Sequence, residues 1–572
     1  MASLQWIGKQ AVVGHHREVP YHLLRGDASL SVGEDGGAGE AYRGVGSGNL
    51  LVQGDNLLAL KALLPYYAGR VKCIYIDPPY NTGNEGWVYN DNTNSPEIRQ
   101  WIGKVVGKEG ETLDRHDRWL CMMYPRLALL KEFLTEDGVL FASIDDVEVD
   151  SLRFLLDEHF GRANRVGTIV WKNATDNNPT NIVPEHEYVL CYAKKKASIP
   201  AEWKAQTSVA QQRLVEIGDD FVSRITDTDE RQAEYTKWFR KHKASLWPFE
   251  DYKFIDDGGI YTGMRSVHNP GKEGYRYDVL HPRTGKPCTE PMMGYRFPKE
   301  TMTDLLAKDR IIFGDDESKL IELKVYAKDY RAKLSSVFEL DGRKGTNEIK
   351  AVFPESKRAF NFPKPTELIE ELLAFTTKAG DIVLDSFAGS GTTGHAIMKL
   401  NKADGGSRRF VLVEMDPTIA EPLTSQRLRR VSEGLTSDGK QEEGLGGGFR
   451  YVTLGEPLFD ERGRLRDAVK FADLAAHVFF TGTGEPIPKR VNGKRSPLIG
   501  ACRGTAYYLL FNGVLGDKRP GGGNVLTGDV LAELRGHDGP RVVFGEACRL
   551  GAARLKREGV TFRQIPYQIK VS

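Results

Sequence analysis

The chain has 572 residues, and at ~150 residues per domain this length predicts about three or four domains. Its hydrophobic fraction of 40% and charged fraction of 27% are typical of a soluble globular protein and exclude a disordered or fibrous one. The formal net charge is +1, from 79 Lys and Arg against 78 Asp and Glu, so no basic field covers the whole molecule.

Membrane and disulfide-rich classes are excluded as well. No apolar run approaches the ~18 residues of a membrane helix, and the N-terminal stretch has no continuous apolar signal core. The six cysteines are scattered without CxxC spacing, so neither a disulfide framework nor a metal site is predicted. We therefore expect a cytoplasmic protein that contacts no membrane.

We expect residues 1–47 to form a flexible arm, because residues 26–48 are rich in Gly, Ser and Ala and have few large apolar side chains. From residue 48 to 196, short apolar runs alternate with amphipathic helical stretches, which is typical of βαβ units and a mostly parallel sheet. The predicted strands are 50–55, 71–77, 139–145, 168–173 and 188–194, and the predicted helices are 56–69, 124–138 and 149–161.

Between 197 and 350 this alternation stops, and aromatic, charged, Gly and Pro residues interleave, so a separate inserted module is predicted. The alternation resumes over 351–435, and one sheet is therefore expected from two separated stretches of chain. A Gly-rich break at 432–448 precedes a C-terminal α/β domain, 449–572. The later predicted strands are 381–387, 409–416, 505–515, 540–547 and 560–571, and the later helices are 365–380, 391–402 and 548–559.

The segment Asp77-Pro78-Pro79-Tyr80 lies at the carboxyl end of the predicted strand 71–77. Ligands of open α/β sheets bind just outside the carboxyl ends of the strands, so these residues are expected to line a ligand crevice. A rigid turn that ends the strand is the alternative, because paired prolines fix φ.

Residues 385–393, DSFAGSGTT, follow a predicted strand and open a helix. Gly389 and Gly391 would let the backbone approach a ligand closely beside a helix N-terminus. The segment lacks the GxGxxG spacing and the GK[ST] of a phosphate-binding loop, so dinucleotide and ATP binding are not favoured. Glu414 ends the next strand, where a carboxylate binds ribose hydroxyls in Rossmann-like sheets.

Together these motifs resemble those of the DNA methyltransferases that modify amino groups with S-adenosyl-L-methionine. The catalytic motif precedes the cofactor motif, with a long insert between them, which is the order of the β class. The segments IDPPYNTG, HDRWLCMMYPRL, GVLFASIDD and NFPKPTELI are similar to the modification subunits of type III restriction-modification systems. The resemblance implies an α/β fold: a circularly permuted, Rossmann-like methyltransferase sheet with a target-recognition domain inserted at 197–350 and a small α/β C-terminal domain.

The resemblance also implies a site-specific enzyme that methylates the N6 amino group of a flipped-out adenine, in a restriction-modification or phage-defence system. An N4-cytosine methyltransferase is an alternative, since its amino chemistry is the same, and so is a DNA-binding specificity subunit with vestigial catalysis. The implied partners are double-stranded DNA, a second copy of the chain in a homodimer, and a helicase-nuclease restriction subunit. The C-terminal domain would then serve interaction or dimerisation.

In such a site, Asp77 and a main-chain carbonyl of Pro78 or Pro79 each accept one N–H of the target amino group, which frees its lone pair for an in-line transfer. Tyr80 would stack on the flipped base. Asp55 would contact the cofactor's adenine amino group or simply cap the following helix. The expected cofactor-binding residues are Asp55, Lys364, Asp385, Phe387, Gly389, Gly391, Thr392 and Glu414, with Asp385 on the methionine ammonium and Lys364 on its carboxylate.

Basic and aromatic residues gather in two stretches of the insert, 231–243 around Trp238 and 261–300 with its four tyrosines. This mixture suits phosphate contacts and base-edge readout. A solvated face of a structural insert is the alternative. The expected DNA-binding residues are Arg240, Lys241, Arg276, Arg283 and Lys286.

Overall fold

The computed structural model divides the chain into two compact units, Glu202–Leu334 and a larger unit made of Met1–Ala201 and Ser335–Ser572. The smaller unit lies within the predicted insert 197–350, but residues 335–350 belong to the larger unit. The described residues are 4–33, 48–82, 103–104, 114–173, 181–203, 209–243, 246, 249–264, 267–269, 271–330, 333–356, 359–437, 440–488, 496–534 and 537–565.

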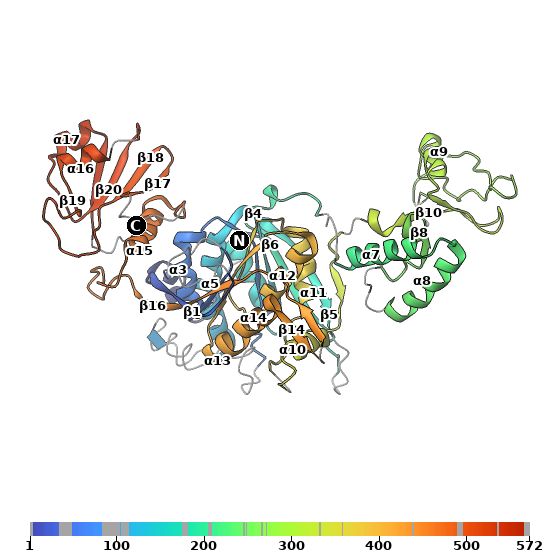
Figure 1. Ribbon diagram of the computed structural model, residues 1–572, viewed down its shortest axis with the longest axis horizontal. Coiled ribbons are helices and arrows are strands. Elements are labelled where there is room, and N and C mark those ends of the chain that lie inside the picture. The colour runs from blue at the N-terminus through green and yellow to red at the C-terminus, as the bar shows by residue number, and fades with distance from the viewer. Residues whose placement is uncertain are drawn as a thin grey trace. The chain divides into compact units, whose positions relative to one another are not determined.

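A ten-stranded sheet forms the centre of the larger unit (Figure 1), in the order β1-β16-β2-β13-β12-β3-β4-β6-β5-β11. The strands from β16 to β4 run parallel, whereas β1 is antiparallel to β16, and β6 is antiparallel to β4 and β5. The predicted mostly parallel sheet is confirmed. The strands are β1 (His22–Val32), β2 (Leu50–Gln53), β3 (Val71–Ile76), β4 (Leu134–Ile144), β5 (Arg165–Lys172), β6 (His186–Ala193), β11 (Val337–Glu339), β12 (Ile382–Asp385), β13 (Arg409–Glu414) and β16 (Phe449–Pro457).

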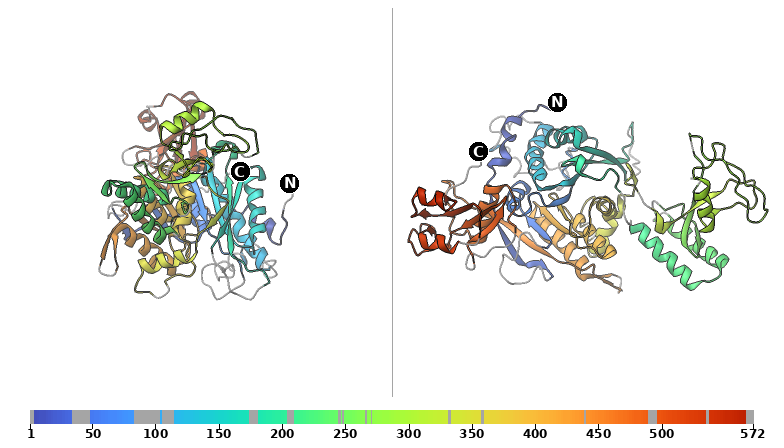
Figure 2. Two further views of the ribbon diagram at one scale, coloured as in Figure 1. Left: turned by 90° about the vertical axis from the view of Figure 1, so that its right-hand side faces the viewer. Right: turned by 90° about the horizontal axis from the view of Figure 1, so that it is seen from above.

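Helices cover both faces of this sheet (Figure 2), as expected for strands that are continuous apolar runs. Val411 and Val413 of β13 pack into the core that also contains α3, α5 and α6 residues, whereas Leu412 between them faces Gly394 of α12 on the other side. The helices are α1 (Lys9–Val12), α2 (His15–Glu18), α3 (Asn56–Tyr67), α5 (Arg115–Phe133), α6 (Val149–Phe160), α10 (Arg343–Val352), α11 (Thr366–Thr376), α12 (Thr392–Asp404), α13 (Pro417–Ile419) and α14 (Gln426–Glu433).

The N-terminal segment contributes an edge strand to the sheet. In β1, Arg25 pairs with Thr453 of β16 and Asp27 pairs with Tyr451. Helices α1 and α2 contact α5, so the predicted flexible arm over 1–47 is wrong for the described residues 4–33. Main-chain pairing with β16 and the burial of Leu23, Leu24 and Val32 order the strand, and the Gly- and Ser-rich composition of residues 26–48 reveals neither contribution. The part of the predicted arm from 34 to 47 lies outside the described residues.

The C-terminal domain begins later than predicted, because residues 449–457 form β16 of the main sheet. A hairpin of β14 (Gly434–Ser437) and β15 (Lys440–Glu443) occupies part of the predicted break. The domain itself is α/β, with a four-stranded sheet β17-β18-β20-β22 in which the predicted strands and helix are present but shorter. Its elements are α15 (Phe471–Thr483), β17 (Leu498–Cys502), β18 (Thr505–Leu509), β19 (Val525–Leu526), α16 (Gly528–Glu533), β20 (Arg541–Gly545), β21 (Ala547–Cys548), α17 (Ala552–Arg557) and β22 (Val560–Gln564).

The smaller unit has a core of its own, in which Tyr235 and Phe249 are fully buried. Two helices pack beside a four-stranded sheet of order β7-β8-β10-β9. Its elements are α7 (Val209–Arg224), α8 (Thr228–His242), β7 (Phe254–Asp256), β8 (Gly259–Met264), α9 (Lys299–Ala307), β9 (Ile311–Ile312) and β10 (Glu322–Tyr326). Across the described residues of both units, no helix is long and apolar enough to cross a membrane.

Candidate active site

Four side chains from both halves of the divided sheet meet at the carboxyl end of β3. Lys364 Nζ lies 3.2 Å from Asp77 Oδ2, 3.1 Å from Glu187 Oε2 and 2.9 Å from the Tyr80 hydroxyl oxygen. That hydroxyl lies 2.9 Å from Asp77 Oδ1 and 2.8 Å from Glu187 Oε2, and it donates its proton to one of them. The predicted catalytic motif therefore belongs to a buried cluster of one cation, two carboxylates and a phenol.

The electrostatics of this cluster favour a basic Asp77. Burial raises the pKa of Asp77, an effect that Lys364 counteracts and Glu187 reinforces. Burial by itself would lower the pKa of Lys364, but Asp77 and Glu187 together raise it above its ordinary value. Lys364 therefore stays protonated, and Asp77 is a better proton acceptor than an exposed aspartate.

The Pro-Pro segment offers one carbonyl to a ligand. The indole Nε1 of Trp119, on α5, donates to the Pro79 carbonyl at 2.6 Å. Among the described residues, no hydrogen bond reaches the Pro78 carbonyl. Asn81 follows with φ of 60°, and its side-chain amide donates to Glu148 Oε1 at 2.6 Å. These contacts narrow the expected carbonyl acceptor to Pro78 and fix the backbone on either side of it.

The predicted cofactor turn follows β12, which lies beside β3. Gly391 has φ of 80° and is the N-cap of α12. A Cβ there would lie 3.1 Å from Thr424 Cγ2, so both the backbone and the space require glycine. The Gly389 amide donates to Glu414 Oε2 at 2.8 Å, which joins the turn to the end of β13. The structure thus brings Gly389, Gly391 and Glu414 together, as predicted.

Asp385, at the end of β12, is a buried carboxylate between the turn and the catalytic cluster. It accepts hydrogen bonds from Thr393 Oγ1 at 2.6 Å and from the Phe387 amide at 2.9 Å. Burial, with a smaller contribution from the charge of Asp77, raises the pKa of Asp385 to about 7 despite these two bonds. Next to it, the Ser386 hydroxyl is buried without a hydrogen-bond partner among the described residues. This corner of the site therefore has polar groups available to a ligand.

Asp55 lies at the end of β2, at the same edge of the sheet. One carboxylate oxygen caps α3 by accepting from the Leu58 amide at 3.0 Å, and the other lies 3.1 Å from Arg126 Nη2. The helix-cap role is thus confirmed, and the cofactor role stays a prediction. Phe387 packs against the sheet core.

Two site residues differ from the sequence prediction. The Lys364 side chain contacts the catalytic cluster, whereas only its main-chain carbonyl contacts the cofactor turn, by accepting from Thr392 Oγ1 at 3.2 Å. Glu187 was not predicted at all. It is the second residue of β6, and since β6 runs antiparallel to β4, its beginning lies at the edge where the parallel strands end. A carboxylate that opens an apolar strand, as in HEYVLCYA, is the signal that could have found it.

The expected DNA-binding residues of the smaller unit fall into two groups. Arg240 and Lys241, at the end of α8, and Arg283 are exposed. Arg276 instead pairs with Glu290, and Lys286 lies 3.1 Å from Glu317, so carboxylates partly neutralise both.

Some basic and aromatic residues of the same two stretches are structural. Arg231 is buried and lies 2.8 Å from Asp257, and Tyr295 is buried beneath the stacked ring of Tyr277. The sequence stretches therefore overstate the surface that could contact DNA.

Comparison with known proteins assigns this site to a family. The sequence model of the N6/N4 methyltransferases, described as DNA methylase, matches residues 71–425. The type III restriction-modification enzyme EcoP15I Mod subunit of Escherichia coli is 46% identical over 453 residues, which span 75% of this chain and 69% of that protein. The EcoPI Mod subunit of Escherichia phage P1 is 30% identical over 457 residues, 73% of this chain and 64% of that protein. The type II methyltransferase M.KpnI of Klebsiella pneumoniae is 28% identical over 405 residues, 66% of this chain and 84% of that protein.

The sheet, its two strand-end motifs and the family match define the class: an α/β DNA methyltransferase of the amino-modifying type. The chain belongs to the N6/N4 DNA methylase family, whose members depend on S-adenosyl-L-methionine. The expected family and fold are thereby confirmed.

The residues present fit this cofactor. A buried carboxylate at Asp385 suits an ammonium group, and the glycine turn permits close approach. The Ser386 hydroxyl, which has no hydrogen-bond partner within the described ranges, offers a further polar contact. Glu414 and Asp55, at the ends of the two neighbouring strands β13 and β2, supply carboxylates for hydroxyl or amino groups. These residues would hold the cofactor, which supplies the transferable methyl group when it is bound.

Proposed function

We propose that this chain is a site-specific DNA methyltransferase that modifies the N6 amino group of a flipped-out adenine, as the modification subunit of a restriction-modification system. The observation that carries the proposal is the Asp77 carboxylate beside the Pro78 carbonyl, next to the glycine turn at the ends of β3 and β12. Similarity to type III Mod subunits over three quarters of the chain supports the assignment.

The chemistry follows from the acceptors. An adenine amino nitrogen is a poor nucleophile because its lone pair is delocalised into the ring. Asp77 and the Pro78 carbonyl each accept one of its N–H groups, which localises the lone pair on the nitrogen. When the new N–C bond forms and the S–C bond breaks, the nitrogen must lose a proton, and Asp77, with its raised pKa, accepts it.

Tyr80 and Lys364 complete the pocket for the base. The Tyr80 hydroxyl is held by Asp77, Glu187 and Lys364, so the ring plane is fixed before any base arrives. Lys364 Nζ lies 4.8 Å from the centre of the Tyr80 ring and 2.9 Å from its hydroxyl oxygen. A fixed aromatic face lowers the entropy cost of stacking a flipped base.

The test is chemical analysis of methylated DNA. DNA incubated with the protein and S-adenosyl-L-methionine is digested to nucleosides and analysed by mass spectrometry. We expect N6-methyladenine, and we expect Asp77→Ala to lose at least about 100-fold in rate while it retains DNA binding. Asp150→Ala, a change at an aspartate whose side chain is 81% exposed on α6, is the matched control. N4-methylcytosine as the sole product would contradict the adenine assignment, and full activity of Asp77→Ala would contradict the mechanism.

We further propose that the smaller unit recognises the DNA target and uses Arg240 and Lys241 for phosphate contacts. Replacing both with Ala should weaken DNA binding at all sequences and reduce the salt dependence of log K by up to about two units of slope. Lys319→Ala, at an exposed lysine of the same unit 3.9 Å from Asp315, serves as the control. An unchanged salt slope in the double variant would argue for the solvated-face alternative.

The remaining assignments concern assembly. We also propose that the chain acts in the cytoplasm as a homodimer and that it associates with a helicase-nuclease restriction subunit. The names of its relatives, which are subunits of type III restriction-modification enzymes, support association with a further subunit. Light scattering of the purified protein, alone and with that subunit, tests both associations.

A further inference from the structure

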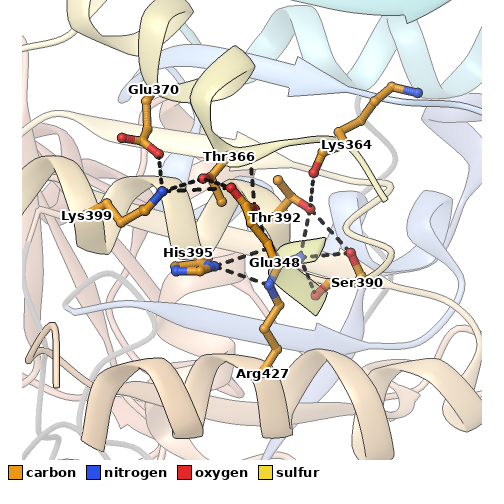
Figure 3. A network of polar contacts seen from close by, with 9 residues as sticks. All are labelled: Glu348, Lys364, Thr366, Glu370, Ser390, Thr392, His395, Lys399 and Arg427. Carbon is orange, nitrogen blue, oxygen red and sulfur yellow. Dashed lines mark hydrogen bonds and ion pairs between the residues drawn. The ribbon is translucent and has the colours of Figure 1, made fainter. Parts of the chain in front are cut away.

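A buried arginine of α14 donates hydrogen bonds to the cofactor turn. Arg427, on α14, is fully buried. Its Nη1 donates to Thr392 Oγ1 at 2.9 Å and to Ser390 Oγ at 3.0 Å, the residues on either side of Gly391 (Figure 3). The same nitrogen lies 3.3 Å from the Ser390 carbonyl oxygen. One guanidinium therefore contacts both residues that flank the glycine.

The other side of this guanidinium contacts Glu348, on α10. Arg427 Nη2 lies 3.3 Å from Glu348 Oε2. Glu348 also accepts hydrogen bonds from the amide of Thr366 at 3.2 Å and from its hydroxyl at 2.7 Å (Figure 3). Thr366 is two residues after Lys364. The pair therefore links the cofactor turn to the segment that carries Lys364.

Helix α10 contacts that segment a second time. A Cβ at Gly345 would collide with the Pro363 carbonyl oxygen, so α10 packs directly on the backbone before Lys364. The turn also contacts the Lys364 segment directly, because the Thr392 hydroxyl donates to the Lys364 carbonyl at 3.2 Å. A closed ring of contacts around Arg427 and Glu348 therefore joins the turn, the Lys364 segment, α10 and α14.

Stability alone does not account for this pair. Taking an arginine out of water is costly, and the burial lowers the pKa of Arg427 to about 10, although Glu348 counteracts the shift. Buried ion pairs are often no more stabilising than apolar replacements of the same size. What the pair adds is direction, because a planar guanidinium fixes several acceptors at set angles.

We propose that Arg427 and Glu348 are positioning residues that hold the cofactor turn and the Lys364 segment in register, and so set cofactor affinity and the rate of transfer. Neither residue contacts the catalytic cluster of Asp77, Glu187 and Tyr80 through any of the described contacts. The inference rests on the proposed function, since the turn is taken to bind S-adenosyl-L-methionine.

The experiment compares two arginine–glutamate pairs whose arginines both lie on α14. Arg427→Gln and Glu348→Gln are tested against Arg430→Gln and Glu355→Gln, a second arginine–glutamate pair that involves α14, at 2.7 Å but with side chains 35% and 57% exposed. Cofactor Kd is measured by equilibrium dialysis with radiolabelled S-adenosyl-L-methionine, and kcat and the Kd for DNA are measured separately. Misplacement by about 1 Å can cost up to ~100-fold, so we expect cofactor Kd to rise at least about tenfold and kcat to fall. DNA affinity and both control variants should stay unchanged.

Rescue separates positioning from general unfolding. Methylguanidine at millimolar concentration should restore cofactor binding to Arg427→Ala by refilling the guanidinium site, and it should have no effect on Glu348→Gln. Wild-type cofactor Kd and kcat in Glu348→Gln, whose replaced side chain is 20% exposed and can be lost without opening a large cavity, would overturn the inference. Failure of the wild-type protein to bind S-adenosyl-L-methionine would instead contradict the proposed function.

Discussion

Replacing Lys364 with Met tests the charge balance of the catalytic cluster. The change keeps the apolar stem but removes the cation, and its side chain is only 7% exposed. Asp77 and Glu187, with side chains 16% and 19% exposed, are then left facing each other. Removing one partner of a buried ion pair costs roughly 3–5 kcal/mol because an uncompensated charge stays behind. The larger unit has more than 400 residues, so at an unfolding entropy of about 2.1 cal/mol/K per residue each kcal/mol shifts its midpoint of thermal unfolding by about 1 °C. At pH 8 this midpoint should therefore fall by roughly 3–5 °C.

The pH dependence of this loss identifies its cause. Burial already raises the pKa of Asp77, and without Lys364 the pKa rises further. A carboxyl group whose pKa is higher in the folded than in the unfolded state binds protons preferentially when folded, so its penalty is complete at high pH and fades as the pH falls through the raised pKa. The gap between the unfolding midpoints of wild type and Lys364→Met should therefore shrink as the pH falls.

Differential scanning calorimetry at four pH values measures this gap. Lys344→Met is the control, since Lys344 lies 3.0 Å from Glu367 in a pair whose side chains are 36% and 44% exposed. Such surface pairs contribute about 0–1 kcal/mol, so the control should unfold within about 1 °C of wild type. An equal loss at every pH, or a loss no larger than that of the control, would refute the electrostatic reasoning.

Two further predictions concern the cofactor corner. Burial raises the pKa of Asp385 to about 7, and only the ionised carboxylate attracts an ammonium group, so cofactor affinity measured by dialysis should increase as the pH rises from 6 to 8. Asp385→Asn should bind the cofactor weakly and show no dependence of affinity on pH. If this variant shows the same pH dependence as wild type, Asp385 is not its source. Gly391→Ala should lose cofactor binding and about 1–3 kcal/mol of stability, because its φ is 80° and the new Cβ meets Thr424. Gly405→Ala at the other end of α12, with φ of 65° and nothing within 4 Å of the new Cβ, should lose stability without loss of cofactor affinity, and equal behaviour of the two variants would contradict the role of the turn.

The strand-end motifs were predictable because parallel strands place their carboxyl ends at one edge of a sheet. Asp77 and Asp385 could be predicted as site residues without knowledge of the strand order. Predicting Glu187 required that knowledge, because β6 begins at that edge only as a result of its antiparallel direction and its place beside β4. The sequence also did not reveal which of the two sites the Lys364 side chain contacts, because a long side chain between two sites can reach either one.

The domain boundaries predicted from composition were wrong where main-chain pairing orders a segment. Residues 26–48 have the Gly- and Ser-rich composition of an arm, yet the part of this stretch that belongs to β1 pairs with β16 across more than four hundred residues of sequence. The exposure suggested for the tyrosines of the insert was wrong for a different reason. Interleaving with basic residues suggested exposure, but rings such as Tyr295 are buried in an apolar cluster of the small unit.

The order of strands in the main sheet determines how long a strand must wait for its neighbours while the chain is synthesised. Strand β2 is made early, but both of its neighbours, β13 and β16, are made about 360 to 400 residues later. At roughly 5–20 residues per second, β2 waits on the order of 20 to 80 s for partners while its apolar residues stay uncovered. The unit Glu202–Leu334 is complete well before then and has a core of its own. The nascent chain should therefore carry the folded unit Glu202–Leu334 while the main sheet is still incomplete, and that interval is when the chain most depends on chaperones.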